Sequence, residues 1–427
     1  MNIPDLYALY LQHPKVGTDT RNIEKDSLFF ALKGPSFNGN DFAQKALDAG
    51  AAYAIIDDAQ QHEDKRFILV DNVLDTLHDL AKTHRETFSI PFIGITGSNG
   101  KTTTKELVHA VLSQQYNTYF TQGNLNNHIG IPLTILRVKR DAEISIIEMG
   151  ANHQKEIESY CLYAQPSLGI ITNCGKAHLE GFGGIEGVRK GKGELYDYIR
   201  AHDGGIFAFD DYDYLHDMSK GIATIHWYGT KDGEVTGKET ANDPFLEVEI
   251  TKGFDKPFTI KTQLVGSYNL PNILCAVAVG NAFQVPAEKI QHAISSYAPS
   301  NSRSQLVQSG SNKIILDAYN ANPTSMAAAI HNFAGLQSDK KVLMVGAMME
   351  LGASSIEEHA HILALIKQYD WDEVVLVGGD FGQIDVTPYV YFADSEKART
   401  WYQAQHFENT EILIKGSNSM HMKRILE

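Results

Sequence analysis

A glycine-rich stretch near residue 100 combines the residue types that bind nucleotide phosphates. It reads Ile93-Gly-Ile-Thr-Gly-Ser-Asn-Gly-Lys-Thr-Thr-Thr104, with a β-branched run before the glycines and a helical pattern after them. A strand, a glycine loop and a helix N-terminus direct backbone N–H groups and the helix dipole at an anion, while a lysine and a hydroxyl reach the phosphates and Mg²⁺. The first glycine of the common phosphate loop would fall at Ile95, so a chance loop is the alternative, but the strand-to-helix context argues against it. We therefore predict an ATP site made by Gly97, Ser98, Asn99, Gly100, Lys101, Thr102 and Thr103.

Metal-assisted chemistry is predicted at the same place. ATP-bound Mg²⁺ takes a hydroxyl, one or two carboxylates and phosphate oxygens, so Thr102 and Glu148 are predicted ligands. Glu148 ends an isoleucine-rich strand pattern, where capping of a helix is its alternative role. His178 follows another such pattern, and its spacing leaves a structural role equally open. Because ligands bind at the carboxyl ends of parallel strands, we expect Gly97, Glu148 and His178 to converge.

Three more charged residues are candidates. Lys192 is an ordinary surface lysine by default. Lys415 ends a buried-looking strand, where a cation can meet a phosphate or carboxylate across a cleft. Asp317 ends another predicted strand and could orient Lys415 or a substrate amine. His359 and His361 are two positions apart and face away from each other on a helix, so we do not predict a metal pair there.

Composition restricts the classes of partner. The 427 residues carry a net charge of −15, which argues against nucleic acid as a partner. The three scattered cysteines are typical of a reducing compartment. No signal peptide is evident, and no apolar run approaches the ~18 residues that span a bilayer. We expect a cytoplasmic protein with no membrane span, and we expect a monomer.

The chain length corresponds to about three domains at roughly 150 residues each. Residues 1–88 predict a small mixed α/β domain, and residues 89–296 a central phosphate-loop domain with a parallel sheet and an added antiparallel lobe. Residues 297–427 predict an open, Rossmann-like sheet. The predicted strands are 27–33, 52–56, 67–70, 144–147, 168–172, 206–209, 313–316, 342–345, 374–377, 389–392 and 412–414, and the predicted helices include 41–52, 71–87 and 270–283.

The phosphate loop, Thr96-Gly-Ser-Asn-Gly-Lys-Thr-Thr103, resembles that of the Mur ligases, which form amide bonds with ATP in peptidoglycan synthesis and include folate polyglutamate ligases. Other segments resemble the members that add D-alanyl-D-alanine to UDP-N-acetylmuramoyl-tripeptide. They are Gly123-Asn-Leu-Asn-Asn-His-Ile-Gly-Ile-Pro132, Glu148-Met-Gly-Ala-Asn152, Asn173-Cys-Gly-Lys-Ala-His-Leu-Glu-Gly-Phe182, Asp317-Ala-Tyr-Asn-Ala-Asn-Pro323 and Met344-Val-Gly-Ala-Met-Met-Glu-Leu-Gly352. The likeness covers all three predicted domains.

The resemblance implies roles for individual residues. Lys101 and Thr102 would hold the β- and γ-phosphates and Mg²⁺, with Glu148 and His178 as metal ligands. Lys192, in Lys-x-x-Leu-Tyr, would carry a carbamate on a second Mg²⁺. The implied nucleotide contacts are Asn127, Asn269 and Asn272, joined by Arg303 and Asp317 when the domains close. The implied catalytic residues are Lys101, Glu148, His178, Lys192, Arg303 and Asp317.

The substrates implied are ATP, UDP-N-acetylmuramoyl-tripeptide and D-alanyl-D-alanine. The dipeptide would be joined to the tripeptide through an acyl phosphate that ATP forms. The implied contacts of the dipeptide are Tyr319, Asn320, Asn322 and Lys415, and those of the UDP end are Thr20, Arg21, Lys33 and Asn40, which on sequence alone fit surface turns as well. The chain departs from the family at Tyr268, Ser302 and Asn418, where His, Gly and Arg are usual.

Two other functions stay open at this stage. One is a different ligase of the same family, although the Asp-Asn-Pro-Arg expected of the member that adds the third amino acid is absent. The other is a nucleotide-binding switch that hydrolyses ATP without an amine acceptor.

Overall fold

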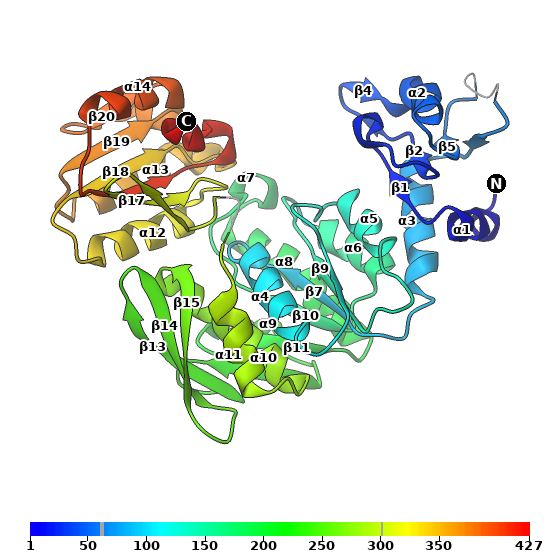
Figure 1. Ribbon diagram of the computed structural model, residues 1–427, viewed down its shortest axis with the longest axis horizontal. Helices are drawn as coiled ribbons and strands as arrows, with labels where there is room; N and C mark the ends of the chain where they lie inside the picture. The colour runs from blue at the N-terminus through cyan, green and yellow to red at the C-terminus, as the bar shows by residue number, and fades with distance from the viewer. Residues whose placement is uncertain (60–63, 300–301) are drawn as a thin grey trace.

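The computed structural model describes residues 1–59, 64–299 and 302–427. The chain forms an α/β structure with three main sheets (Figure 1). The N-terminal sheet and the C-terminal sheet lie at opposite ends of the view, and the central sheet lies between and below them. Among the described residues, no helix combines the length and apolar character needed to cross a membrane.

The N-terminal sheet has four parallel strands in the order β1-β2-β5-β6. The strands are β1 (Val16–Gly17), β2 (Leu28–Phe30), β5 (Tyr53–Ile56) and β6 (Phe67–Leu69), with a hairpin of β3 (Lys33–Gly34) and β4 (Phe37–Asn38). The other elements are α1 (Ile3–Gln12), η1 (Thr20–Asn22), η2 (Gly39–Phe42), α2 (Ala43–Asp48) and α3 (Val73–Arg85). The helix predicted over 41–52 is divided: residues 41–42 belong to η2, which the Asn38 side chain caps by accepting from the Asn40 N–H, and α2 ends at Asp48.

Helix α3 connects the N-terminal sheet to the central unit. The Asn72 side chain caps its first turn by accepting from the Leu74 and Asp75 N–H groups. At its last turn Arg85 donates to the carbonyls of Ala164 and Gln165 at 3.0 and 2.9 Å. Helix α3 therefore follows the N-terminal sheet in the chain and is anchored to the central unit through Arg85.

The central sheet has nine strands in the order β15-β14-β13-β12-β11-β10-β7-β9-β8. Its parallel part comprises β7 (Phe92–Thr96), β8 (Thr118–Phe120), β9 (Ile144–Glu148), β10 (Leu168–Ile171), β11 (Gly205–Phe209) and β12 (Thr224–Gly229). Strand β12 pairs in parallel with β13 (Val235–Asn242), which continues antiparallel into β14 (Phe245–Lys252) and β15 (Phe258–Val265). The predicted antiparallel lobe is confirmed, and it is an extension of the same sheet.

Helices cover the central sheet on both faces. They are α4 (Lys101–Leu112), α5 (Gly130–Ile135), α6 (Glu156–Ala164), α7 (Leu179–Phe182), α8 (Ile185–Ala201), α9 (Asp213–Met218), η4 (Ser267–Asn269), α10 (Leu270–Ala282) and α11 (Ala287–Ser296). Helices α4 and α10 pack against each other, which brings the phosphate loop beside the start of α10.

The C-terminal sheet has six strands in the order β16-β17-β21-β18-β19-β20. They are β16 (Gln305–Ser309), β17 (Asn312–Asp317), β18 (Lys341–Gly346), β19 (Glu373–Val377), β20 (Val390–Phe392) and β21 (Glu411–Lys415), and only β16 pairs antiparallel among these described strands. Its faces are covered by α12 (Pro323–Gly335) and α13 (Ser355–Ile366), and by α14 (Ser395–Gln405) and η8 (Met422–Leu426). The short elements η5 (Gly352–Ser354), η6 (Gly379–Gln383) and η7 (Asn418–Met420) follow strands.

Candidate active site

The phosphate loop connects β7 to α4 and cannot accept side chains at its glycines. Gly97 has φ +145°, and a Cβ there would lie 1.9 Å from Thr172 Oγ1. Gly100 has φ +79°, and its Cβ would lie 2.5 Å from Asn272 Oδ1. The loop thus combines left-handed backbone with close packing, which is why glycine is required at both positions.

Lys101 lies folded back over this loop. Its ammonium donates to the Gly97 carbonyl at 2.7 Å and to the Ser98 carbonyl at 3.3 Å. Burial lowers the pKa of Lys101 to about 8; the Glu148 carboxylate opposes this decrease, and the positive charge of Arg303 contributes to it. A phosphate bound in the loop would place negative charge beside this ammonium and favour its protonated form.

Glu148 ends β9 and is the carboxylate at the foot of the loop. Its Oε1 accepts from Thr102 Oγ1 at 3.2 Å and from Asn126 Nδ2 at 2.7 Å. Its Oε2 is buried with no hydrogen bond, and Lys105 Nζ lies 3.5 Å away. A buried carboxylate oxygen without a hydrogen bond beside a threonine hydroxyl is a donor set that suits Mg²⁺. Lys105 was not predicted as a site residue, although it lies one helical turn after Lys101.

His178 lies on the wall of the same cavity as Glu148, so these two predicted ligands do converge. It has a left-handed backbone, with φ +53°. Its Nδ1 lies 2.5 Å from Glu350 Oε2 of the C-terminal unit, and this His178 side chain holds the pKa of Glu350 below its usual value. A second ion pair beside it joins Lys176 to Glu358 at 2.5 Å. The ring is thus tied to the opposite unit, which its sequence position did not indicate.

Lys192 is not a surface residue, and the default interpretation was wrong. It lies in α8, 0% exposed, and its Nζ donates to the Ala151 carbonyl at 3.0 Å. Ala151 lines the cavity, so the amine lies directly behind the wall. Burial lowers the pKa of Lys192 to about 7, and the nearby Lys101 charge contributes to that decrease.

The C-terminal sheet brings its own charges to the site. Lys415 Nζ lies 2.5 Å from Asp317 Oδ2, so the two predicted strand-end residues do meet. The Arg303 guanidinium stacks 3.5 Å from the Tyr319 ring centroid. Lys415 also donates to the Asn320 carbonyl at 3.4 Å. These groups line one side of the cavity.

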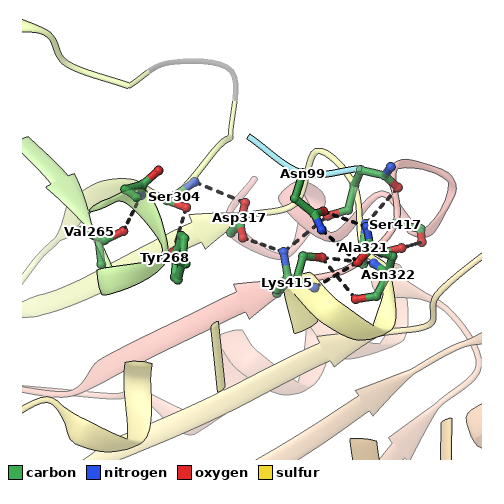
Figure 2. A network of polar contacts seen from close by, with 12 residues as sticks. Asn99, Val265, Tyr268, Ser304, Asp317, Ala321, Asn322, Lys415 and Ser417 are labelled. Atoms are coloured by element: carbon green, nitrogen blue, oxygen red, sulfur yellow. Dashed lines mark hydrogen bonds and ion pairs between the residues drawn. The ribbon is translucent and has the colours of Figure 1, made fainter. Parts of the chain in front are cut away.

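The cavity has a volume of about 1000 Å³ and lies between the central and C-terminal units. Figure 2 shows side chains that cross this boundary. Asn322, the N-cap of α12, donates to Asn99 of the phosphate loop at 2.7 Å. Predicted residues on the cavity wall are Ser98, Asn99, Gly100, Lys101, Thr102, Thr103, Asn127, Glu148, His178, Asn269, Asn272, Arg303, Asp317, Tyr319, Asn320 and Lys415.

The predicted nucleotide amides are held by one another. Asn272 Nδ2 donates to Asn269 Oδ1 at 3.0 Å, and Asn269 donates to the Val265 carbonyl at 2.9 Å. Thr104 donates to Asn272 at 3.1 Å, which links these amides to α4. Asn127 accepts from the Ile129 and Gly130 N–H groups at 3.1 and 2.9 Å, at the start of α5.

The predicted residues of the first unit lie away from the cavity. Among the described cavity-lining residues, none comes from residues 1–88. Lys33 Nζ and the buried Asn40 Nδ2 both contact Asp57 Oδ1, at 2.9 and 2.8 Å. Thr20 begins η1, and Arg21 is exposed and paired with Asp19.

Comparisons with known proteins agree over nearly the whole chain. Residues 14–85 match the model described as "Mur ligase family, catalytic domain", residues 95–280 the "Mur ligase middle domain", and residues 302–418 the "Mur ligase, glutamate ligase domain". A *Bacillus subtilis* protein named UDP-N-acetylmuramoyl-tripeptide--D-alanyl-D-alanine ligase is 35% identical, covering 96% of this chain and 92% of that protein. The protein of that name in *Escherichia coli* is 33% identical over the same shares.

Solved structures are similar over the same length. The MurF structure from *Acinetobacter baumannii* has a TM-score of 0.88 at 28% identity and covers 96% of this chain and 92% of that one. The MurF ligase of *Thermotoga maritima*, solved in complex with ADP, has a TM-score of 0.87 at 26% identity and covers 97% of both chains.

Proposed function

The chain belongs to the Mur ligase family, and we propose that it is the ATP-dependent ligase that joins D-alanyl-D-alanine to UDP-N-acetylmuramoyl-tripeptide. The observation that carries this proposal is the shared cavity. A phosphate loop with its lysine lies on one wall, and the Asp317–Lys415 pair and Arg303 lie on the other. Such a cavity can hold ATP and the dipeptide amine on either side of the terminal carboxylate of the tripeptide.

The first chemical step is transfer of the γ-phosphoryl group to the terminal carboxylate of the tripeptide. Lys101 and Arg303 are the cations placed to stabilise negative charge on the transferring group. The loop amides fix the phosphates, since Gly97 and Gly100 let the backbone approach closely. In the second step the dipeptide amine attacks the acyl phosphate, the C–N bond forms and phosphate leaves. Asp317, Asn320, Tyr319 and Asn322 are proposed to orient that amine.

Thr102, Glu148 and His178 are the proposed Mg²⁺ ligands, and the hydrogen-bond-free Glu148 oxygen supports that assignment. Bound Mg²⁺ would polarise the phosphate oxygens. A second ion is proposed at Lys192. A lysine with a pKa of about 7 is about half uncharged at neutral pH, so its nitrogen can attack CO₂ and lose a proton to give a carbamate. That carbamate would be a metal-ligating carboxylate.

We propose that residues 1–88 bind the UDP end, residues 89–296 bind ATP and residues 297–427 bind the dipeptide. Thr20, Arg21, Lys33 and Asn40 are the proposed UDP contacts, and Asn127, Asn269 and Asn272 the proposed nucleotide contacts. A monomer in the cytoplasm suits this reaction, because all three substrates are small and ATP is a cytoplasmic metabolite.

The test is phosphate release by the purified protein with ATP, Mg²⁺, UDP-N-acetylmuramoyl-tripeptide and D-alanyl-D-alanine, each omitted in turn. We expect release only when all four are present, with a product heavier by the dipeptide. Release that ignores both peptide substrates would instead identify an ATPase switch. The same assay with glutamate and a folate acceptor separates the other ligase of the family.

Lys33→Ala is expected to raise the KM for the UDP substrate about tenfold and to change kcat less than about twofold. The reason is that Lys33 is half-exposed and can reach a phosphate, while the reacting carboxylate lies elsewhere. Steady-state kinetics with varied nucleotide substrate measure this. The matched control is Lys45→Ala, an exposed lysine of α2, and an unchanged KM in Lys33→Ala would return Lys33 to the surface-turn interpretation.

A further inference from the structure

The backbone on either side of Arg303 has unusual dihedral angles. Ser302 has φ +57° and Ser304 has φ +48°, so both are left-handed although neither is glycine. This conformation costs free energy in a residue with a side chain and persists only where other contacts enforce it. The residue between them, Arg303, lines the cavity. The unusual conformation is therefore located where a side chain enters the proposed site.

Hydrogen bonds on each side of Arg303 enforce this conformation. The Ser302 carbonyl accepts from the Ala318 N–H at 3.0 Å. The Ser304 N–H donates to Asp317 Oδ1 at 3.3 Å. The Ser304 hydroxyl shares a hydrogen bond of 2.9 Å with the Tyr268 hydroxyl. The first two contacts lie within the C-terminal unit, and the third comes from the central unit.

Tyr268 is placed to make that third contact reliably. It belongs to η4, directly before α10, and lines the cavity. Figure 2 shows its side chain directed at Ser304, with Asp317 and Lys415 beyond. Burial, and then the Asp317 carboxylate, raise the pKa of Tyr268, so the hydroxyl keeps its proton. Asp317 in turn forms an ion pair with Lys415, so the contacts that run from Tyr268 through Ser304 to Asp317 end at a paired charge.

Among the described residues, the Arg303 side chain is held by its contact with the Tyr319 ring alone. Its guanidinium stacks on Tyr319, and its charge is one of the causes that lower the pKa of Lys101. Both cations line the cavity in which the γ-phosphoryl group would transfer. The position of Arg303 then depends on its backbone, which the contacts of Ser302 and Ser304 define.

We propose that Tyr268 is a positioning residue which, through Ser304, holds Arg303 toward the phosphoryl group only while the C-terminal unit is docked on the central unit. This inference rests on the proposed function for its kinetic consequence. It gives the departure from histidine at this position a role, since a tyrosine hydroxyl reaches across the boundary to Ser304.

The first test is hydrogen exchange of the nucleotide-free protein. In Tyr268→Phe the ring stays and the hydroxyl is lost, so amide exchange over residues 302–306 is expected to become about fivefold to tenfold faster. Ser304→Ala should give the same increase, and the double variant no more than either. Tyr116→Phe is the matched control, because its hydroxyl also bonds across elements, to the Phe283 carbonyl at 2.8 Å, far from this segment in the chain.

The second test is a double-mutant cycle with Arg303→Ala. Tyr268→Phe is expected to lower kcat about tenfold with the KM for ATP changed less than about twofold. In the Arg303→Ala background the same substitution should lower kcat less than about twofold, because the group it positions is gone.

Three results would contradict the proposal. Unchanged exchange in Tyr268→Phe would overturn it, and so would a tenfold loss of kcat that persists without Arg303. A raised KM for ATP with normal kcat would also overturn it and make Tyr268 a nucleotide contact. If the wild-type protein forms no amide product, the proposed function fails, while the exchange experiment still decides whether Tyr268 holds the segment.

Discussion

Lys101→Ala is expected to lower the amide-forming rate by at least about 10³-fold while the fold stays intact. Among the described residues, the ammonium donates to two loop carbonyls, and it lies beside the proposed site of phosphoryl transfer, so its loss removes charge stabilisation of the transferring group. Burial disfavours the charged form and lowers its pKa to about 8, so removal of the ammonium relieves this burial cost and is not expected to destabilise the fold. The rate of coupled ADP formation and a thermal melt measure both parts.

The control for this prediction is Lys139→Ala, an exposed lysine of the central unit, which should leave both measurements unchanged. Turnover by Lys101→Ala within tenfold of the wild type would contradict the ATP assignment of the loop. A large decrease in melting temperature would mean that the lysine supports the loop structurally.

Lys192→Met is expected to abolish ligase activity and yet stabilise the fold. The wild-type amine is completely buried, with one carbonyl acceptor, so its charged form is disfavoured. A folded pKa of about 7 against 10.5 in the unfolded chain costs roughly 5 kcal/mol when the lysine is protonated in both states. Methionine has a similar shape and no charge, so it removes that cost along with the proposed carbamate.

The pH dependence gives this prediction a sign. Below pH 7 the lysine is protonated in both states, and the full cost is present. As pH rises from about 7 toward 10.5 the unfolded chain binds more protons than the folded one, so this group makes stability increase with pH. Denaturant unfolding at pH 7 and pH 9 should show a larger increase for the wild type than for Lys192→Met.

Lys192→Arg is the matched variant, because arginine stays charged at every pH in this range. It should be inactive and less stable than the wild type, with no gain between pH 7 and 9 from this position. Equal stability of the methionine and arginine variants would show that burial of charge at this site is not costly.

The phosphate loop and most of the parallel strands could be predicted from the sequence. Both are local: a loop of glycines between a strand and a helix, or a run of β-branched residues, carries its signal within a dozen positions. The strands β8 and β16 were missed because both are edge strands. Their side chains are half-buried or exposed, so they lack the continuous apolar pattern of the buried strands.

The contacts between units could not be predicted in this way. Asn99 and Asn322 are 223 positions apart, and nothing near either residue indicates the other. The same is true of His178 and Glu350. The burial of Lys192 was missed for a different reason: its neighbours in α8 are glycine, lysine and glutamate, a pattern that on its own favours a solvated face.

The parallel pairing of β12 with β13 makes one sheet of the phosphate-binding strands and the antiparallel hairpins. A continuous hydrogen-bonded sheet resists bending within its plane, so the two parts are expected to move together as one rigid body. When the C-terminal unit moves, the whole central sheet is then expected to move relative to it. A displacement of β13, β14 and β15 would therefore report on that movement. A fluorescent probe at the exposed Lys252 end of β14, opposite the end that pairs with Val265 beside Asn269, could therefore follow the catalytic cycle without disturbing it.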